Sequence, residues 1–313
     1  MDTRCRVSKV IAVLSGGVGA ARLLAALSES LDPNEITAIV NVGDDLVMHG
    51  LTICPDLDTI MYTLAGRNNH ELGWGLAGES WRVMEELNAL GGAAWFRLGD
   101  RDLATHLYRS QRLSEGATKT QVTAELCERL GVKVRLLPVT NDVLATVFDT
   151  DLGRLSFQEY FVRHHHDVAV TAIDVVGADQ ATATPDVRAA LVEASRIVIA
   201  PSNPLISIDP LLRVPGVREV LEQRRDVVVG VSPIIDGRAL KGPADRLLAE
   251  LGHEVSCLGV VDFYKGLVGT WIIDEADADR ADEVRGRGVN VTVTTTIMAE
   301  RENAQRLCAA VLA

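Results

Sequence analysis

The segment KVIAVLSGGVGAARLLAALSES, residues 9–30, constrains the fold more than any other part of the chain. A short apolar run ends at a glycine-rich turn, and Leu23, Leu24 and Leu27 then recur at helical spacing. A second apolar run, EITAIVNVGDD, follows shortly afterwards. Two short strands joined through a helix form a parallel, right-handed crossover. The sequence therefore predicts an α/β fold with a Rossmann-like, doubly wound and mostly parallel sheet.

Two later segments extend this sheet. RIVIAPSNP (196–204) and DVVVGVSPII (226–235) are β-branched runs that stop at serine and proline, and helical patterns separate them from their neighbours. Because parallel strands present their carboxyl ends on one side, we expect the loops after these strands to leave the same edge as the glycine-rich turn.

The region from about 66 to 180 reads as a helical and mixed-strand insertion within a single elaborated domain, 1–313. Helices are expected at 79–90, 101–113 and 120–130, the last with Thr120 as its N-cap and Gly131 after its end. The runs VKVRLLPV, LATVFDT, RLSFQEYFV and VAVTAIDVV then predict short strands in an antiparallel or mixed arrangement.

Composition excludes several classes of protein. Hydrophobic residues make up 47% of the chain, yet no apolar run approaches the roughly 18–20 residues of a membrane span. The start MDTRCRVSKV lacks the features of a secretory signal, and the five cysteines, including Cys5, are scattered without a CxxC pair. A net charge of -12 disfavours nucleic-acid binding. We therefore expect a cytoplasmic protein that binds neither membrane nor nucleic acid.

The glycine-rich turn, SGGVGAAR, is a candidate phosphate site. Gly16, Gly17 and Gly19 allow a tight turn at a helix N-terminus, whose free N–H groups favour an anion. The Lys-Ser/Thr ending of a Walker A loop is missing, which argues against ATP hydrolysis of that type. The alternative interpretation is a tight turn without a ligand.

Carboxylates are concentrated in NVGDDLVMHGLTICPDLDT, residues 41–59. Asp44 and Asp45 follow the second strand, where a dinucleotide-binding enzyme keeps a ribose-binding acid. Asp56 or Asp58 taken alone is explained as the cap of a helix at 59–65. Both pairs are nevertheless expected at the carboxyl edge of the sheet, where carboxylates beside a diphosphate require a divalent cation, and Mg²⁺ is the simplest choice. Asp44 is the one assigned most readily to a structural role.

A second polar segment, RLGDRDLATHLYRS (97–110), places Arg101, Thr105 and Arg109 four residues apart, with His106 adjacent. Such a helix face is suited to clamping phosphates or an acidic substrate. An ordinary solvated face with charge pairs is the competing interpretation.

Taken together, these stretches resemble one family, the 2-phospho-L-lactate transferases that build the deazaflavin coenzyme F-420. The matching segments are GGVGAARLL, NVGDD, HGLTICPDLDTIMYTLAG, LGDRDLATHLYRSQ, FQEYFVR, APSNPLISI, VPGVREVL and VSPIIDGRALKGPADRLL, in order from residue 16 to 248, followed by GVVDFYKGLV. The resemblance implies a Rossmann-like homodimer that depends on Mg²⁺. It also implies transfer of a phospho-acid group from a guanosine diphosphate-linked donor to the ribityl hydroxyl of the deazaflavin Fo, with release of GMP.

The resemblance also distributes roles among residues. The family's Fo-binding acid falls on Asp58 and its basic partner on Arg97. Asp45, Asp56 and Asp58 are the catalytic and metal-binding candidates, with Asp58 holding Fo, binding metal or doing both through a bridging water. The candidates for holding the donor and its phosphates are Gly16, Gly17, Gly19, Arg22, Arg101, His106, Ser202, Asn203, Ser232 and Lys241.

Asp209 and Asp236 stand where many members of the family have glycine, so the acid carried by the donor stays open between lactyl, enolpyruvyl and 3-phosphoglyceryl. Two other functions compete with the transferase. Relatives of the same fold are nucleotide-sugar-binding regulatory proteins, but they lack CPDLDT together with GDRDLATH. An NAD-dependent dehydrogenase leaves the second pair of aspartates unexplained.

Overall fold

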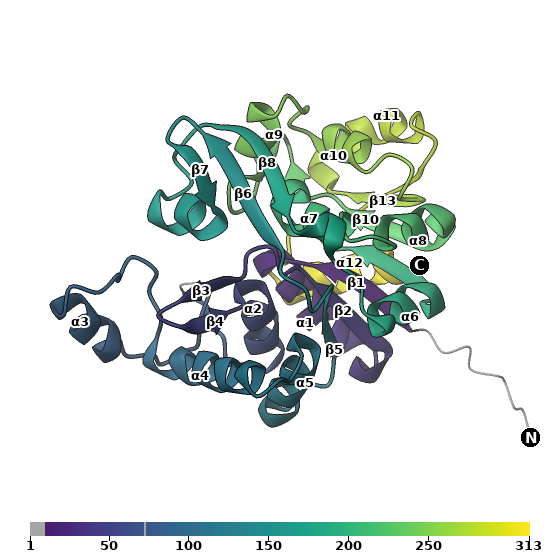
Figure 1. Ribbon diagram of the computed structural model, residues 1–313. Coiled ribbons are helices and arrows are strands. Elements are labelled where there is room, and N and C mark those ends of the chain that lie inside the picture. Colours follow the sequence, from purple (N-terminus) through teal and green to yellow (C-terminus); the bar gives the residue numbers. More distant parts are fainter. Residues whose placement is uncertain (1–9, 72) are drawn as a thin grey trace, which may run out of the picture.

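The computed structural model describes residues 10–71 and 73–313, and a seven-stranded parallel sheet lies at its centre (Figure 1). The strand order is β14-β13-β10-β9-β1-β2-β5, and all neighbouring strands run parallel. Chain order reverses direction at β1, which places the glycine-rich turn at the switch point where α/β sheets bind ligands. The strands are β1 (Ile11–Ser15), β2 (Ile36–Val40), β5 (Arg135–Pro138), β9 (Arg196–Ile199), β10 (Val228–Val231), β13 (Thr270–Ile273) and β14 (Asn290–Val293).

The predicted fold class is confirmed. β1, β2, β9 and β10 lie in the four segments where parallel strands were expected, and they are adjacent in the sheet. Their burial explains this arrangement, because every residue of β1, β2 and β10 is buried, as in a sheet covered on both faces. The predicted start of the first strand at Lys9 and the thiol of Cys5 lie outside the described residues.

The assignment of VKVRLLPV to an antiparallel or mixed insertion is wrong. β5, within this segment, pairs in parallel with β2 and forms one edge of the main sheet. Residues 66–180 therefore contain two separate excursions from the sheet, a helical one before β5 and a stranded one after it. The parallel strands β13 and β14 add a further edge that the sequence patterns above did not predict.

The second excursion is a three-stranded antiparallel sheet in the order β7-β6-β8. Its strands are β6 (Ala145–Thr150), β7 (Gly153–Ser156) and β8 (Val170–Val176), which confirms three of the short strands predicted in this region. A π-helical turn, Glu159–Arg163, follows β7 within the FQEYFVR motif. Two small hairpins complete the strands: β3 (Leu46–Met48) with β4 (Leu51–Ile53), and β11 (Ile234–Ile235) with β12 (Arg238–Ala239).

The helices confirm the three expected in the first excursion, with shifted ends. The last of them begins at Lys119, and Thr118 rather than Thr120 is its N-cap, because Thr118 and Gln121 form a capping box. Figure 1 shows α3 projecting away from the sheet. The helices are α1 (Gly17–Ser30), α2 (Pro55–Leu64), α3 (Arg82–Ala89), α4 (Asp100–Ser114), α5 (Lys119–Leu130), α6 (Pro185–Glu193), α7 (Asp209–Leu212), α8 (Val217–Gln223), α9 (Ala244–Glu250), α10 (Cys257–Phe263), α11 (Ala281–Arg285) and α12 (Arg301–Leu312).

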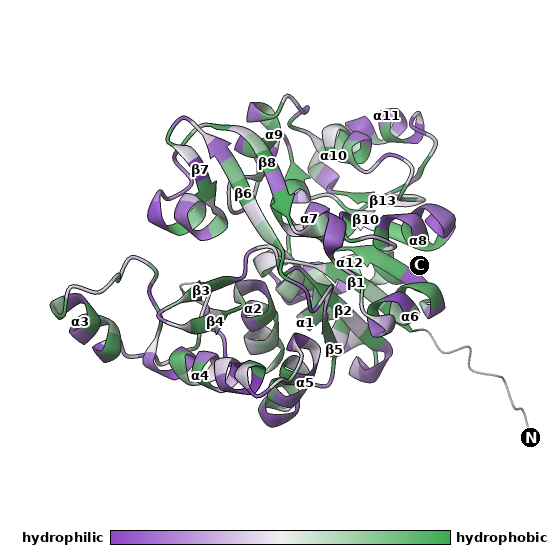
Figure 2. Ribbon diagram, in the orientation of Figure 1, coloured by the Kyte–Doolittle hydropathy of each residue, from purple (hydrophilic) through white to green (hydrophobic). Residues whose placement is uncertain are grey.

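The apolar core follows the main sheet, whose strands are the most uniformly hydrophobic part of Figure 2. A separate small core around Ile53, Met84 and Leu98 joins the β3–β4 hairpin to α3 and α4. No helix in the described ranges is long and apolar enough to cross a membrane. Cys54, Cys127, Cys257 and Cys308 are free thiols and buried, as expected for scattered cysteines.

Candidate functional site

The glycine-rich turn packs directly against the loop after β9. A side-chain carbon added to Gly19 would lie 2.4 Å from the carbonyl oxygen of Pro201, so this position accepts only glycine without a backbone shift. Gly17 has a positive φ of 69°, which also favours glycine. The hydroxyl of Ser202 donates to the carbonyl of Gly16 at 2.7 Å. The structure therefore brings Gly16, Gly17, Gly19 and Ser202 together as predicted.

The side-chain carboxylate of Asp56, a residue of α2, lies at the N-terminus of α1. The amide of Gly17 donates to Asp56 Oδ1 at 2.6 Å, and a side-chain carbon on Gly16 would lie 2.8 Å from Asp56 Oδ2. Asp56 was one of two residues considered as the cap of its own helix; the N-cap of α2 is Cys54 instead. The Gly17 N–H group in the first turn of α1 thus already binds one internal carboxylate, which is favourable at the positive end of a helix.

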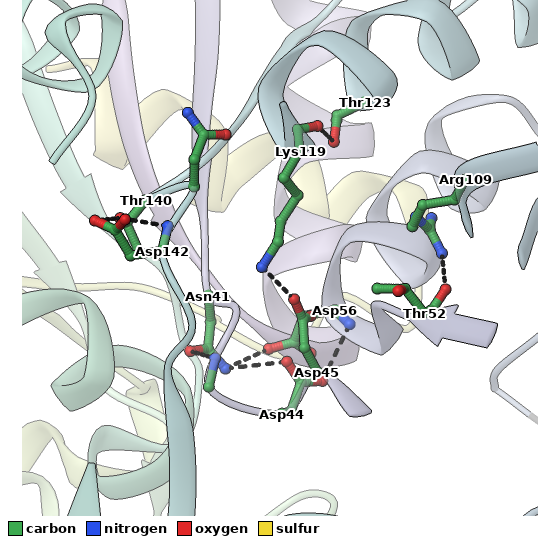
Figure 3. Close-up of polar contacts among 12 residues, drawn as sticks. Asn41, Asp44, Asp45, Thr52, Asp56, Arg109, Lys119, Thr123, Thr140 and Asp142 are labelled. Carbon is green, nitrogen blue, oxygen red and sulfur yellow. Dashed lines mark hydrogen bonds and ion pairs between the residues drawn. The ribbon is translucent and has the colours of Figure 1, made fainter. Parts of the chain in front are cut away.

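Asp44, Asp45 and Asp56 form a cluster at the carboxyl edge of β1 and β2, hereafter the acidic cluster (Figure 3). Asn41 links two of them, because its Nδ2 donates to Asp56 Oδ2 at 2.9 Å and to Asp44 Oδ1 at 3.4 Å. The amide of Asp56 donates to Asp44 Oδ2 at 3.1 Å. Asn41 was not among the predicted site residues, although its position directly after a buried strand is the signal that identified the aspartates.

Lys119, at the first position of α5, is the second residue that the sequence did not identify. Its Nζ lies 2.5 Å from Asp45 Oδ2, and the side chains of Lys119 and Asp45 are 11% and 12% exposed. Figure 3 shows the lysine extending from its helix down to the acidic cluster. No local pattern in the sequence announces this contact, since 74 positions separate the two residues.

The acidic cluster is held from the second excursion as well. Gln158, between β7 and the π-helical turn, donates from its buried side chain to the carbonyl of Asp44 at 2.9 Å. The amide of Thr146 in β6 donates to the carbonyl of Gly43 at 2.8 Å. Asn41 Nδ2 also lies 3.4 Å from the carbonyl of Ile206. These contacts fix the backbone of the turn that carries Asp44 and Asp45.

Burial dominates the electrostatics of the acidic cluster. It raises the pKa of Asp44 well above the ordinary value, and repulsion from Asp56 and Asp45 adds to this. Burial also raises the pKa of Asp45, although Lys119 opposes the shift. The pKa of Asp56 rises to about 6, again through burial, with the hydrogen bonds from Asn41 and Gly17 acting in the opposite direction. Three carboxylates thus share a site that disfavours their charged forms.

One or two oxygens of the acidic cluster suit a divalent cation, although Asp44, Asp45 and Asp56 are not among the described groups of three whose ligand atoms all lie within 4.8 Å of one another. Asp45 Oδ1 is buried and accepts no hydrogen bond from the described residues. When all three carboxylates are ionised they carry three negative charges, and Lys119 is the one cation that pairs with them in the described part of the chain. Hard cations such as Mg²⁺ prefer carboxylate oxygens and use one or two of them in sites shared with phosphates. Asp45 and Asp56 therefore stay our candidate ligands.

The raised pKa of Asp56 predicts a pH dependence of stability in the metal-free protein. A carboxyl with a folded pKa of about 6 and an unfolded value near 3.9 destabilises the fold above pH 6, and this penalty is relieved as the pH falls. Between pH 7.5 and pH 5 the free energy of unfolding should rise by about 1–2 kcal/mol from this group. Urea denaturation in EDTA measures it. The Asp56→Asn variant should lack this part of the rise, and parallel profiles for the two proteins would contradict the assignment.

A second cluster of charges lies on α2 and α4, hereafter the buried charge network (Tyr62, Asp58, Asp102, His106 and Arg109). Arg109 donates from Nη1 to Asp58 Oδ2 at 3.0 Å and from Nη2 to Asp58 Oδ1. His106 Nε2 lies 3.3 Å from Asp102 Oδ2, and the Tyr62 hydroxyl donates to Asp102 Oδ1 at 2.6 Å. Burial alone would raise the pKa of Asp102, but the adjacent His106 and the hydrogen bond from the Tyr62 hydroxyl bring it below the ordinary value.

Asp58 belongs to the buried charge network and not to the acidic cluster. In the described ranges, Asp58, Asp102 and His106 are the three side chains whose possible metal-ligand atoms all lie within 4.8 Å of one another. The expected metal set of Asp45, Asp56 and Asp58 is not such a group. Both oxygens of Asp58 accept from the Arg109 guanidinium, whose positive charge repels a cation. Asp58 is thus an ion-pair partner in this structure, and its metal role stays a prediction.

The helix face predicted from Arg101, Thr105 and Arg109 is divided. Arg101 is exposed, and its guanidinium donates to the carbonyl of Ala77, whereas Arg109 is buried. The residues of this helix that come together are Asp102, His106 and Arg109, a spacing of four and then three residues that sequence reasoning had not assembled. The first two are near neighbours of Arg109 on one face of α4.

Arg97 lies outside both clusters. Its guanidinium stands over the ring of Trp81, 4.3 Å from the ring centroid, which is a cation–π contact. Trp81 in turn meets Trp74 edge to face, with ring centroids 6.0 Å apart. Arg97 is exposed, so the structure leaves it free to meet a ligand but does not join it to Asp58 through any contact in the described ranges.

The remaining predicted donor residues are spread along the carboxyl edge and beyond it. Asn203 caps the turn after β9 through its Oδ1, and its Nδ2 is buried without a partner among the described residues. Ser232 is buried; its hydroxyl exchanges hydrogen bonds with Ile234 in its own turn, and its amide donates to the carbonyl of Ile272. Lys241 is exposed and lies near Gly73, since a carbon added there would be 3.4 Å from its Nζ.

Arg22 is exposed on α1, where it lines a cleft of about 540 Å³ between α1, the loop after α2 and α12. The two aspartates that depart from the resemblance are also accounted for locally. Asp209 accepts from Arg213 at 2.6 Å, and exposed Asp236 has a positive φ of 47° in the β11–β12 turn. Neither aspartate contacts the acidic cluster in the described ranges.

Comparison with known proteins identifies the family of this chain. A family model described as 2-phospho-L-lactate transferase CofD matches residues 11–310. The chain belongs to the CofD family. This CofD-family chain is therefore a transferase of the class that handles phosphorylated acids, and the acidic cluster and glycine-rich turn lie within the matched residues.

Similar proteins of other organisms are named phosphoenolpyruvate transferases. The Streptomyces coelicolor protein is 43% identical over 296 residues, covering 93% of each chain. The Mycolicibacterium smegmatis protein is 42% identical over 308 residues, covering 93% of this chain and 94% of that protein. Among solved structures, protein BH3568 from Bacillus halodurans aligns with a TM-score of 0.63 at 19% identity, covering 97% of this chain and 99% of the other. A second structure of BH3568, described as a member of the UPF0052 family, gives 0.61. At this identity the likeness concerns the fold alone.

Proposed function

We propose that the chain transfers an enolpyruvyl-phosphate group from a guanosine diphosphate-linked donor to the deazaflavin Fo. The ribityl hydroxyl oxygen of Fo forms a new bond to the phosphorus that carries the acid. The bond from that phosphorus to the bridging oxygen breaks, GMP leaves with the electron pair, and the hydroxyl proton passes to a base. The product is the phosphorylated deazaflavin bearing the acid.

The observation that carries this proposal is the CofD family match across residues 11–310. The choice of enolpyruvyl over lactyl or phosphoglyceryl rests on the names of relatives that are 42–43% identical over almost the whole chain. The site adds chemical support. A helix N-terminus beside an acidic cluster at the carboxyl edge of β1 and β2 offers the kinds of group that bind a diphosphate and a divalent cation.

Residue roles follow from the geometry. The N–H groups of Val18 and Gly19 continue the first turn beyond Gly17 and are proposed to receive the donor phosphates. Asp45 and Asp56 would hold Mg²⁺, which neutralises charge on a diphosphate and favours its displacement. Asp56 is also our candidate acceptor of the hydroxyl proton.

Asp58 and Arg97 are proposed to contact Fo, as the resemblance implies. The Arg109 guanidinium fixes both oxygens of Asp58, so this carboxylate is held in one orientation toward an acceptor hydroxyl. Preorganisation of this kind reduces the cost of positioning a substrate.

A direct assay of both products tests the reaction. The purified chain is incubated with Fo, Mg²⁺ and, in separate reactions, the enolpyruvyl, lactyl and phosphoglyceryl guanosine diphosphates. GMP release and the phosphorylated deazaflavin are followed by chromatography. We expect product with the enolpyruvyl donor at the highest kcat/KM. Absence of product with every donor would refute the transferase, and preference for another donor would refute only the assigned acid.

Calorimetry provides a complementary measurement against the nucleotide-sugar-binding alternative. The transferase should bind Fo and ignore a uridine diphosphate sugar, whereas a regulatory binding protein should show the reverse.

We also propose a homodimer, as the resemblance implies. Val83 on the projecting helix α3 and Leu90 at its C-cap are 50% and 84% exposed, which leaves apolar surface available there. Light scattering should give twice 33.7 kDa.

A further inference from the structure

Lys119 stands in an environment that does not favour a lysine. It is the first residue of α5, where the positive end of the helix dipole repels a cation. Its side chain is only 11% exposed, so the ammonium has lost most of its hydration. The ammonium has one ion-pair partner in the described part of the chain, Asp45 Oδ2 at 2.5 Å. The position therefore depends on this one carboxylate for its compensation.

The same carboxylate faces two ways. Asp45 Oδ2 meets Lys119, and Asp45 Oδ1 is buried without a hydrogen bond from any described residue. Asp44 and Asp56 direct their oxygens to Asn41 and to the amides of Asp56 and Gly17 instead. Asp45 is thus the member of the acidic cluster with one oxygen paired to a resident cation and the other without a hydrogen bond from the described residues.

We propose that Lys119 is a built-in counter-ion of the acidic cluster, and that it lowers the affinity of this site for a divalent cation. This inference rests on the proposed Mg²⁺ site, and it concerns a residue that the proposed reaction does not use. In the metal-free protein the ammonium offsets part of the cluster's negative charge. When a divalent cation binds, the ammonium either stays nearby and repels it or must leave Asp45.

Two effects of Lys119 on cation binding oppose each other. A residue that orients a metal ligand from behind usually strengthens binding, and its loss costs about 10–100-fold in affinity. A fixed positive charge on the same carboxylate weakens binding by Coulomb repulsion, which acts with twice the strength on a divalent ion and is poorly screened at a buried site. The repulsion should win, because Asn41, Gln158 and Thr146 already hold the acidic turn without Lys119.

The test compares three substitutions at one position. Lys119→Gln removes the charge but keeps a hydrogen-bond donor, Lys119→Met removes both, and Lys119→Arg keeps the charge. Mn²⁺ and Mg²⁺ are titrated into each protein by calorimetry without substrates. We expect the Gln and Met variants to bind the cations roughly tenfold or more tightly than the wild type, and the Arg variant to stay within about threefold of it.

The melting temperature supplies a second measurement, independent of the calorimetric titration. In EDTA, the Gln and Met variants should melt below the wild type, because the acidic cluster has lost its counter-ion. Added Mn²⁺ should raise their melting temperatures by more than it raises that of the wild type. The Asp45→Asn/Lys119→Gln double variant should lose the gain in cation affinity, since it lacks the shared carboxylate.

The outcomes separate this inference from the metal site itself. Cation binding by the wild type with equal or weaker binding by Lys119→Gln would overturn the inference and leave the metal site intact. Binding by Lys119→Gln alone would support it in its strongest form. If neither protein binds a divalent cation, the proposed Mg²⁺ site fails, and the role of Lys119 fails with it.

Discussion

Replacing Arg109 by methionine should destabilise the protein by about 3–5 kcal/mol. The substitution leaves Asp58 as a buried carboxylate without its partner, next to Asp102 in the same network, while methionine fills much of the arginine volume. The loss is therefore electrostatic rather than a matter of cavity formation. Urea denaturation, monitored by far-ultraviolet circular dichroism, measures the free energy of unfolding.

Two further variants sharpen this measurement. Asp58→Asn/Arg109→Met removes both charges and should recover most of the stability, because no buried charge is left unpaired. Arg112→Met, on the next turn of α4, breaks ion pairs with Glu115 and Glu125 that are partly exposed, and its effect should be much smaller. Equal losses in Arg109→Met and Arg112→Met would show that burial does not control these pairs.

Replacing Asp45 by asparagine should lower kcat/KM of the proposed transfer by roughly two to three orders of magnitude. The asparagine side chain keeps the shape of the aspartate but loses the charge that a divalent cation and Lys119 share. A loss of about 3–4 kcal/mol of transition-state stabilisation corresponds to this factor. Initial rates of GMP release at saturating Mg²⁺ give the value.

Asp186→Asn is the matched control for this experiment. Asp186 is an exposed carboxylate in the first turn of α6, paired with Arg135, and it has no contact with the acidic cluster in the described ranges. Its removal should change kcat/KM by less than about threefold. The assignment of Asp45 would be wrong if both variants kept full activity.

The central sheet could be predicted because its strands are buried on both faces. β1, β2, β9 and β10 read as continuous apolar runs that end at glycine, serine or proline, and a strand–helix–strand unit has one common handedness. β5 was misplaced, because a short strand after a helical excursion carries no local sign of which sheet it joins. Trp271 and its neighbours in β13 form a similar apolar run, TWII, ending at Asp274, which is a signal that was available.

The site was predictable where it depends on strand ends. Asp44, Asp45 and Asp56 were expected near the glycine-rich turn because β1 and β2 are adjacent and parallel, and the structure places them there. Pairing between side chains was not predictable in the same way. Lys119 contacts Asp45 across 74 positions of the chain, and Asp58 forms an ion pair with Arg109 of α4. Such contacts depend on how excursions dock, which spacing along the chain does not encode.

The contacts that hold the acidic turn also bear on how this chain folds. The carbonyl of Asp44 is bonded by a residue 114 positions later, and Asn41 meets a carbonyl 165 positions later. Forming such contacts requires closing long loops of chain before any stabilisation is gained, which is typical of slow steps in folding. The acidic turn can therefore reach its final form only after β6, the π-helical turn and the segment following β9 have come together. A fragment that ends between residues 56 and 206 would contain every aspartate of the acidic cluster and still lack at least the contact between Asn41 and Ile206.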